Sequence, residues 1–188
     1  MKRHFLLILT MSFALQVFSQ QTDSFTDERD GKTYKIVTIG NQIWMAENLA
    51  FKIEQGGEYT YDNNQEQIAK YGYLYNWGAA QIACPQDWRL PSRDDFKTLL
   101  DNVGGKGKVT FQALLPDGSS GYSASFGGWI KDGTKYKNIE EYGLYWSSSA
   151  ANLSNGLFLS IDRRFKIAGI FSNGFKWYGY SVRCVKDK

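Results

Sequence analysis

The sequence is poor in histidine, and its only histidine, His4, stands near the start of the chain. The remainder therefore cannot build a Ser-His-Asp triad, a Cys-His dyad or a histidine-ligated zinc or iron site. Carboxylate, lysine, tyrosine and thiol chemistry is still available, but no motif marks a glycosidase pair of carboxylates. These absences favour a binding protein over an enzyme.

The chain also lacks a hydrophobic run long enough to cross a membrane, and an apolar stretch interrupted by polar residues fills most of the first nineteen residues. Lys2 and Arg3 precede this stretch, and Val17 and Ser19 fit the residues that signal peptidase prefers before its cut. A membrane anchor is the alternative, but the run is short for a span of about 20 residues. We expect residues 1–19 to be a cleaved signal peptide and the protein to be exported to the periplasm, the cell surface or the medium.

An excess of charge of one sign is missing as well. The chain holds 22 Lys and Arg against 19 Asp and Glu, and loss of Lys2 and Arg3 with the leader leaves 20 against 19, a net charge near +1. Nucleic-acid-binding proteins usually carry a strong basic surface. We therefore expect no nucleic-acid partner.

Cysteine is limited to Cys84 and Cys184. Two cysteines in an exported protein favour one disulfide. This bond would close a loop of about a hundred residues and stabilise the fold by roughly 4.7 kcal/mol in the chain-entropy model. The alternative is two free thiols that bind a metal or take part in catalysis.

Turn residues and hydrophobic alternation outline one domain, which we expect to span residues 30–188 after a flexible lead at residues 20–29. Alternating residues on both sides of Gly40-Asn41 predict a hairpin. The polar stretch from Glu54 to Gln67 predicts a surface loop.

Two short helices are expected next. Apolar and small residues between Leu74 and Ala83 have the spacing of a helix that is buried on one side. The second helix has Ser92 as its N-cap, with Asp95 three residues later as in a capping box, and it should end at Gly104-Gly105.

The rest of the chain divides into long ordered loops and strands. Residues 104–141 are rich in Gly, Ser and Lys with isolated aromatics, and such loops often carry function. Strand-like patterns follow at residues 144–148, 157–161, 165–170 and 180–185. A hairpin, two helices, long loops and then strands indicate an α+β fold with an antiparallel sheet.

Six blocks in order, covering nearly all of the chain after the leader, resemble the Fibrobacter succinogenes major paralogous domain, a family found in exported proteins. The blocks are Asp30–Tyr34, Gln42–Leu49, Tyr71–Trp77, Cys84–Pro85 with Trp88–Ser92, Tyr145–Ser149 and Ser181–Val185. The Trp88–Pro91 segment is also similar to one in formylglycine-generating enzymes, which have an elaborated C-type-lectin-like fold. The resemblance implies a C-type-lectin-like architecture, with Cys84 and Cys184 in the place of its long-range disulfide.

The resemblance raises calcium as a cofactor. C-type lectins that bind sugars through calcium use a Glu-Pro-Asn or Gln-Pro-Asp loop and a later Trp-Asn-Asp, whereas this chain has Leu115-Pro116-Asp117 and Trp146-Ser147-Ser148. Calcium prefers about six to eight oxygen ligands, several of them carboxylates. We expect no cofactor, and Asp117 is the best isolated candidate for a calcium ligand. Formylglycine-generating activity needs two active-site cysteines, but the two present match structural positions.

Aromatic residues of the loops form the candidate ligand-binding surface. They are Tyr122, Phe126, Trp129 and Tyr136 in the glycine-rich segment, with Trp177 and Tyr178 before the last strand. Such residues can stack on sugar rings or grip a peptide, and the alternative is that they pin their own loops. The tryptophans of the family blocks, Trp44, Trp77, Trp88 and Trp146, are expected mostly in the core.

We therefore expect a recognition module that binds a glycan or a cell-surface or extracellular protein through its long-loop region. A structural or surface-assembly role is the second hypothesis, and an enzyme is the third. Binding predicts exposed aromatics around Trp129 and Trp177, assembly predicts an extensive apolar face, and catalysis predicts a cleft with perturbed carboxylates. Arg89 and Arg183 are interpreted as structural residues that tie strands and loops through several donors.

Overall fold

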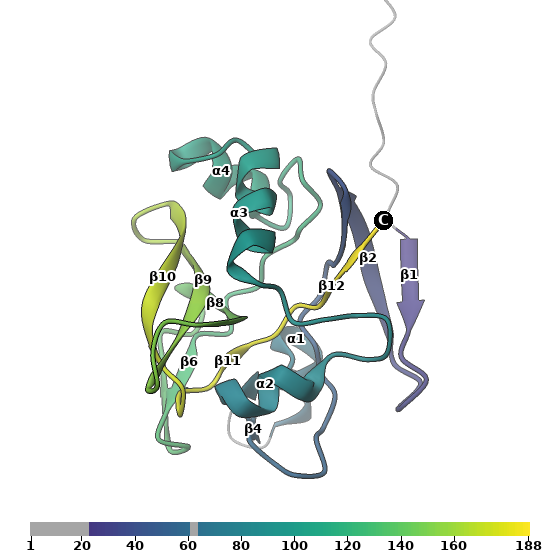
Figure 1. Ribbon diagram of the computed structural model, residues 1–188, viewed down its shortest axis with the longest axis vertical. Coiled ribbons are helices and arrows are strands. Elements are labelled where there is room, and N and C mark those ends of the chain that lie inside the picture. The colour runs from purple at the N-terminus through teal and green to yellow at the C-terminus, as the bar shows by residue number, and fades with distance from the viewer. Residues whose placement is uncertain (1–22, 61–63) are drawn as a thin grey trace, which may run out of the picture.

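Three sheets and four helices make up the part of the chain that the computed structural model describes, residues 23–60 and 64–188 (Figure 1). The helices are α1 (Gln65–Tyr71), α2 (Trp77–Ala83), α3 (Arg93–Asn102) and α4 (Gly107–Leu114). The strands are β1 (Asp23–Thr26), β2 (Thr33–Ile39), β3 (Gln42–Met45), β4 (Glu58–Tyr59), β5 (Leu74–Tyr75), β6 (Trp129–Lys131), β7 (Lys135–Lys137), β8 (Tyr142–Ala150), β9 (Asn155–Asp162), β10 (Ile167–Phe175), β11 (Tyr180–Ser181) and β12 (Val185–Asp187). The expected signal peptide lies outside the described residues. Within them, no helix is long and apolar enough to span a bilayer.

The four-stranded sheet has the order β1-β2-β3-β12. The predicted hairpin is confirmed as β2 and β3, with Gly40 in a left-handed conformation at the turn. The expected flexible lead is wrong from Asp23 onward, because β1 pairs with β2 and the Phe25 ring packs 5.1 Å from that of Trp88. A free strand edge and an aromatic partner therefore order this polar segment.

The six-stranded sheet has the order β10-β9-β8-β11-β5-β4, and every pair is antiparallel except β11 with β8. The predicted α+β class with mostly antiparallel sheets is confirmed. In Figure 1 the four-stranded sheet and strands β8–β10 stand on opposite sides of the domain, with α3 and α4 above and α1 and α2 below.

A short C-terminal segment joins the two large sheets. It runs from β11 in the six-stranded sheet to β12 in the other, where Val185 lies opposite Trp44. Between these strands Cys184 is bonded to Cys84 at the end of α2, with the two Cα atoms 5.8 Å apart. The predicted disulfide is confirmed.

The number of helices differs from the two expected. Helix α3 is confirmed with its capping box of Ser92 and Asp95, and the first expected helix is shortened to α2 because Leu74–Tyr75 pairs as β5. Helix α1 lies partly in the segment read as a loop, where Asn64 caps it and only one side is buried. Helix α4 was not predicted, because it has no side-chain cap that a sequence pattern could reveal. Packing of its buried face against the core stabilises it instead.

The core tryptophans follow the expectation in three of four cases. Trp44 and Trp146 are fully buried, and Trp88 is nearly so. Trp77 is half-buried and donates its indole N–H to the Ser147 carbonyl at 2.9 Å.

Asp95 links α3 to the four-stranded sheet, directly to β3 and through Arg89 to β12. Its carboxylate accepts hydrogen bonds from Arg89, from the Ser92 backbone N–H and hydroxyl, both at 2.7 Å, and from Gln42 at 3.0 Å. Burial pushes its pKa up, but the hydrogen bonds from Arg89 and Ser92 outweigh burial and hold the pKa below its ordinary value. Arg89 reaches Asp187 of β12 as well, at 3.0 Å, so this arginine ties a strand and a helix through their carboxylates.

Asp95→Asn is expected to lower the free energy of unfolding by roughly 2 kcal/mol at pH 7, since it removes the ion pair and half of the capping box. Because the folded-state pKa of Asp95 is depressed, its contribution is complete above the unfolded value near 4 and is lost as the pH falls through the folded value. The variant should therefore lose less stability than the wild type on acidification, measured by urea unfolding at neutral and acid pH. Asp94→Asn is the control, an exposed carboxylate in the same turn. An equal loss of unfolding free energy in Asp95→Asn and Asp94→Asn would show that the hydrogen bonds of Asp95 do not stabilise the fold.

Candidate functional site

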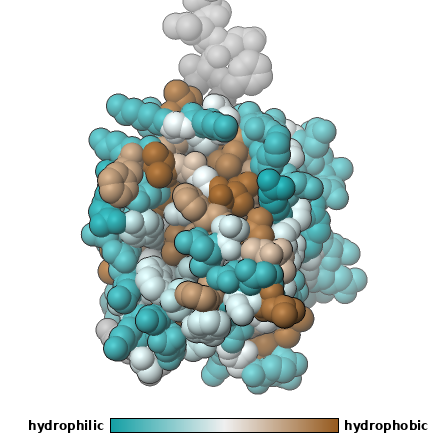
Figure 2. All heavy atoms as spheres, turned by 60° about the vertical axis from the view of Figure 1, so that its left-hand side comes forward, coloured by the Kyte–Doolittle hydropathy of each residue, from teal (hydrophilic) through white to brown (hydrophobic). Residues whose placement is uncertain are grey.

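An open groove of about 550 Å³ crosses one face of strands β8, β9 and β10 and continues to β6 and β11. We call it the aromatic groove, and its lining residues are Trp129, Asn138, Tyr142, Leu144, Phe158, Ser160, Asp162, Ile167, Phe171, Asn173, Phe175, Tyr178 and Tyr180. Figure 2 brings this side of the domain forward and shows apolar residues gathered in a band, with hydrophilic residues around it.

Strand alternation builds the groove. On β9, Phe158, Ser160 and Asp162 line it, while Leu159 and Ile161 point into the core. A Cβ atom at Gly174 of β10 would lie 2.8 Å from Trp146 and 2.9 Å from Phe158. Glycine therefore allows the backbone of β10 to approach these two rings closely.

Four aromatic side chains form a continuous ladder that starts in the groove lining with Trp129, Tyr178 and Phe175 and ends outside the lining at Trp177. The ring centroids of Trp129 and Tyr178 are 4.8 Å apart, those of Tyr178 and Phe175 are 5.3 Å apart, and those of Phe175 and Trp177 are 4.5 Å apart. Trp177 is 48% exposed and Phe175 is 38% exposed. Mutual packing thus fixes the orientation of rings that still present large surfaces to solvent.

Polar groups are interspersed among these rings. Asn138 accepts from the Trp129 indole at 3.4 Å and donates to Glu141 at 2.6 Å, so its amide is anchored. The Asp162 carboxylate accepts two backbone N–H groups of the β9–β10 turn. Ser160 and Asn173 make no side-chain hydrogen bond to the residues that the structure describes, and both line the groove. These two side chains are free to bond a ligand.

The structure brings three of the predicted site residues together and separates two. Trp129, Trp177 and Tyr178 belong to the aromatic ladder. The prediction for Tyr122 is wrong, because this ring is fully buried; Phe126, also proposed as a loop aromatic, is buried too.

Tyr122 packs against the rings of Trp44 and Tyr145, with the Arg183 guanidinium 4.4 Å from its ring. Tyr136 lies in a different hollow beside Tyr59 and Tyr73, where its hydroxyl donates to the Thr60 carbonyl. A shared glycine-rich segment therefore does not place its aromatics on a shared surface.

Sequence reasoning missed most of the groove that the strands supply. Phe158, Phe171 and Phe175 lie on β9 and β10, where the strand-like patterns predicted strands but no ligand-binding residues. On β9 the residues that alternate with Leu159 and Ile161 line the groove, so the alternation itself could have pointed to them.

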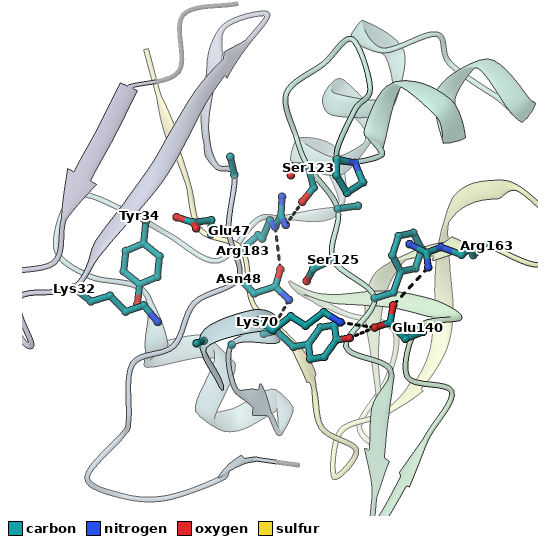
Figure 3. Close-up of a pocket in the computed structure, with 17 residues that line it drawn as sticks. Lys32, Tyr34, Glu47, Asn48, Lys70, Ser123, Ser125, Glu140, Arg163 and Arg183 are labelled. Carbon is teal, nitrogen blue, oxygen red and sulfur yellow. Dashed lines mark hydrogen bonds and ion pairs between the residues drawn. The ribbon is translucent and has the colours of Figure 1, made fainter. Parts of the chain in front are cut away.

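A second hollow, of about 280 Å³, lies between β2, the segment after β3, helix α1 and the loop at residues 123–126 (Figure 3). We call it the polar pocket, and its charged and hydroxyl-bearing lining includes Lys32, Tyr34, Glu47, Lys70, Tyr71, Ser123, Ser125, Glu140, Arg163 and Arg183. None of these residues lines the aromatic groove.

Glu140 is the centre of an ion-pair network on one wall of the polar pocket. It accepts from Lys70 at 2.6 Å and from the Tyr71 hydroxyl, and Arg163 lies 3.5 Å away (Figure 3). The hydrogen bonds from Lys70 and Tyr71 hold the pKa of Glu140 below its ordinary value. A carboxylate held ionised in this way suits electrostatic pairing more than proton donation.

Asp117, the isolated calcium candidate, is exposed after α4. Within residues 23–60 and 64–188, no group of three or more Asp, Glu, Cys or His side chains could hold a metal ion.

The fold and the groove define a disulfide-closed α+β domain with an exposed aromatic surface built on a mostly antiparallel sheet. The chain belongs to the family described as Fibrobacter succinogenes major domain, whose family model matches residues 37–186. No curated protein and no solved structure matches the chain.

Proposed function

We propose that this protein is an exported, non-catalytic recognition module that binds a glycan through the aromatic groove. The observation that carries the proposal is the ladder of Trp129, Tyr178, Phe175 and Trp177 beside the unpaired side chains of Ser160 and Asn173. Export is supported by the disulfide, because disulfides persist in oxidising compartments, and by the leader pattern of the first nineteen residues.

The chemistry of the groove fits a sugar chain. Pyranose rings present C–H groups on their faces, which pack on aromatic rings, and hydroxyl groups at their edges, which need hydrogen-bond partners. The groove offers rings on its walls and amide and hydroxyl groups between them. Its volume of about 550 Å³ lies in the usual range of ligand sites.

A C-type-lectin-like fold is part of the same proposal. It is supported by the long-range disulfide that fastens the C-terminal strands, by the long ordered segments before β8, and by the Trp88–Pro91 block. Sugar binding without a metal would distinguish this domain from lectins that bind through calcium.

Strand β10 favours a second candidate function. This function is pairing with another protein chain, either a cell-surface or extracellular protein or a further copy in a surface assembly. This strand is at the edge of the six-stranded sheet and exposes Ile167 and Phe171, which are 43% and 42% accessible. Exposed apolar edge strands are templates for pairing with another chain. Sedimentation analysis tests this function, since assembly predicts a concentration-dependent increase in mass.

The glycan proposal is tested on an array of glycans with the mature protein, in calcium and in chelator. For a glycan bound in chelator, Trp129→Ala and Trp177→Ala are each expected to weaken binding about tenfold or more, because aromatic anchors dominate such interfaces. Phe165→Ala is the matched control, an exposed aromatic that belongs neither to the groove lining nor to the ladder. Unchanged affinity in both tryptophan variants would show that the groove is not the site, and hits only with calcium would require a metal site instead.

A further inference from the structure

The floor of the polar pocket covers a buried positive charge. Arg183 is fully buried, and its guanidinium donates to the Asn48 side-chain oxygen at 3.1 Å and to the Ser123 carbonyl at 2.7 Å (Figure 3). It also donates to the Tyr122 carbonyl. All three acceptors are neutral. No carboxylate of the described residues forms an ion pair with Arg183. A cation buried without a counter-ion is costly, and its field is weakly screened.

The rim of the pocket adds cations that exceed its anions. Lys70 and Arg163 share the single carboxylate of Glu140. Lys32 forms no ion pair within the described residues, and its ammonium lies 5.5 Å from the centre of the Tyr34 ring, at the pocket wall. The lining thus holds four cationic side chains against two carboxylates, those of Glu47 and Glu140, which leaves two positive charges in excess. The pocket therefore attracts an anion.

A hydrogen-bonding group in the lining has no partner. The Ser125 hydroxyl oxygen is buried and makes no hydrogen bond to the described residues. Buried polar atoms are nearly always paired, so such an exception at the wall of a pocket points to a missing ligand atom or water. Ser123 adds a second hydroxyl to the same wall.

We propose that the polar pocket binds a small polyhydroxy carboxylate, the chemical class of a uronic-acid monosaccharide. The carboxylate is attracted by Arg183 and pairs with Lys32, and the sugar hydroxyls bond Ser125 and Ser123. A volume of about 280 Å³ is small for a ligand site and limits the occupant to about one sugar ring. The two glutamates in the lining disfavour a second negative charge, which selects a monoanion over a phosphate dianion.

This site is independent of the aromatic groove. The test is an NMR titration of the purified protein with glucuronate, with glucose as the neutral counterpart that has a hydroxymethyl group in place of the carboxylate. We expect saturable amide shifts at Asn48, Ser123 and Ser125 with glucuronate and none with glucose. Absence of saturation, or equal shifts with glucose, would overturn the proposal. So would tighter binding of N-acetylglycylglycine or inorganic phosphate, which would assign the pocket to a peptide terminus or a phosphate.

Two variants that preserve the fold separate a specific site from general charge attraction. Lys32→Gln is expected to weaken glucuronate binding about fivefold, and Ser125→Ala about threefold to tenfold. Ser125→Ala retains both bonds between the Ser125 backbone and the Tyr145 hydroxyl. Lys108→Gln, an exposed lysine outside the pocket, is the charge-matched control and should bind as the wild type does. Trp129→Ala should leave this affinity unchanged even if it abolishes binding in the groove. Wild-type affinity in both pocket variants would contradict the assignment.

Discussion

Replacing both cysteines, in a Cys84→Ala/Cys184→Ala variant, is expected to lower the free energy of unfolding by about 3 to 5 kcal/mol. The bond joins residues 100 positions apart. It fastens the end of α2 to the segment that passes from β11 to β12, and therefore to both large sheets. Without it, the unfolded chain gains the conformational freedom of a loop of about 100 residues.

Urea unfolding with and without a reducing agent measures this effect. The oxidised wild type should unfold at a higher urea concentration than the double variant, and reduction should bring the wild type close to the variant. The variant itself is the control, because it should not respond to the reductant. Equal midpoints for the oxidised wild type and the variant would show that the disulfide does not stabilise the fold.

Arg183→Met is expected to lower the free energy of unfolding by about 3 to 5 kcal/mol. The substitution fills part of the space but leaves three acceptors, on Asn48, Tyr122 and Ser123, without their donor in a buried region. It also removes the cation that packs 4.4 Å from the Tyr122 ring. The loop that forms one wall of the polar pocket should loosen as a result.

Arg89→Met is the matched control for Arg183→Met. The Arg89 side chain is 42% exposed. When it is lost, Asp187, which is 80% exposed, can turn to water, and the less exposed Asp95 keeps its hydrogen bonds from Ser92 and Gln42. Its substitution should cost only about 1 to 2 kcal/mol in the same urea experiment. A larger loss for Arg89→Met than for Arg183→Met would contradict the view that burial decides the difference between the two arginines.

Local signals in the sequence were sufficient where neighbouring residues decide the conformation. The capping box of Ser92 and Asp95 predicts α3, and the turn at Gly40-Asn41 predicts the hairpin of β2 and β3. Both signals depend on hydrogen bonds and backbone preferences within a few residues. Helix α4 lacks such a signal, because its N-terminus has no side-chain cap and burial of its apolar face stabilises it.

The candidate site also has a part that could be predicted from the sequence and a part that could not. Trp129, Trp177 and Tyr178 could be named from their loop positions, but Tyr122 in the same glycine-rich segment is buried beside Arg183. Alternation along a strand tells which residues share a face, and it does not tell which face is covered by helices. That choice depends on α3 and α4. Both helices pack against β10, and they cover the face of the sheet on which Leu159 and Ile161 of β9 lie.

The sequence by itself determined the α+β class, the paired cysteines, the lack of any histidine after His4, and Trp129, Tyr178 and Trp177 of the aromatic ladder. These properties depend on composition, local periodicity and short turns, all of which can be read along the chain. Only the tertiary structure decided that the groove lies on β8–β10 and that a buried Arg183, which forms no ion pair with the described residues, lies beneath a second pocket. Both sites are assembled from segments far apart in sequence, and their burial and charge balance exist only after those segments have packed together.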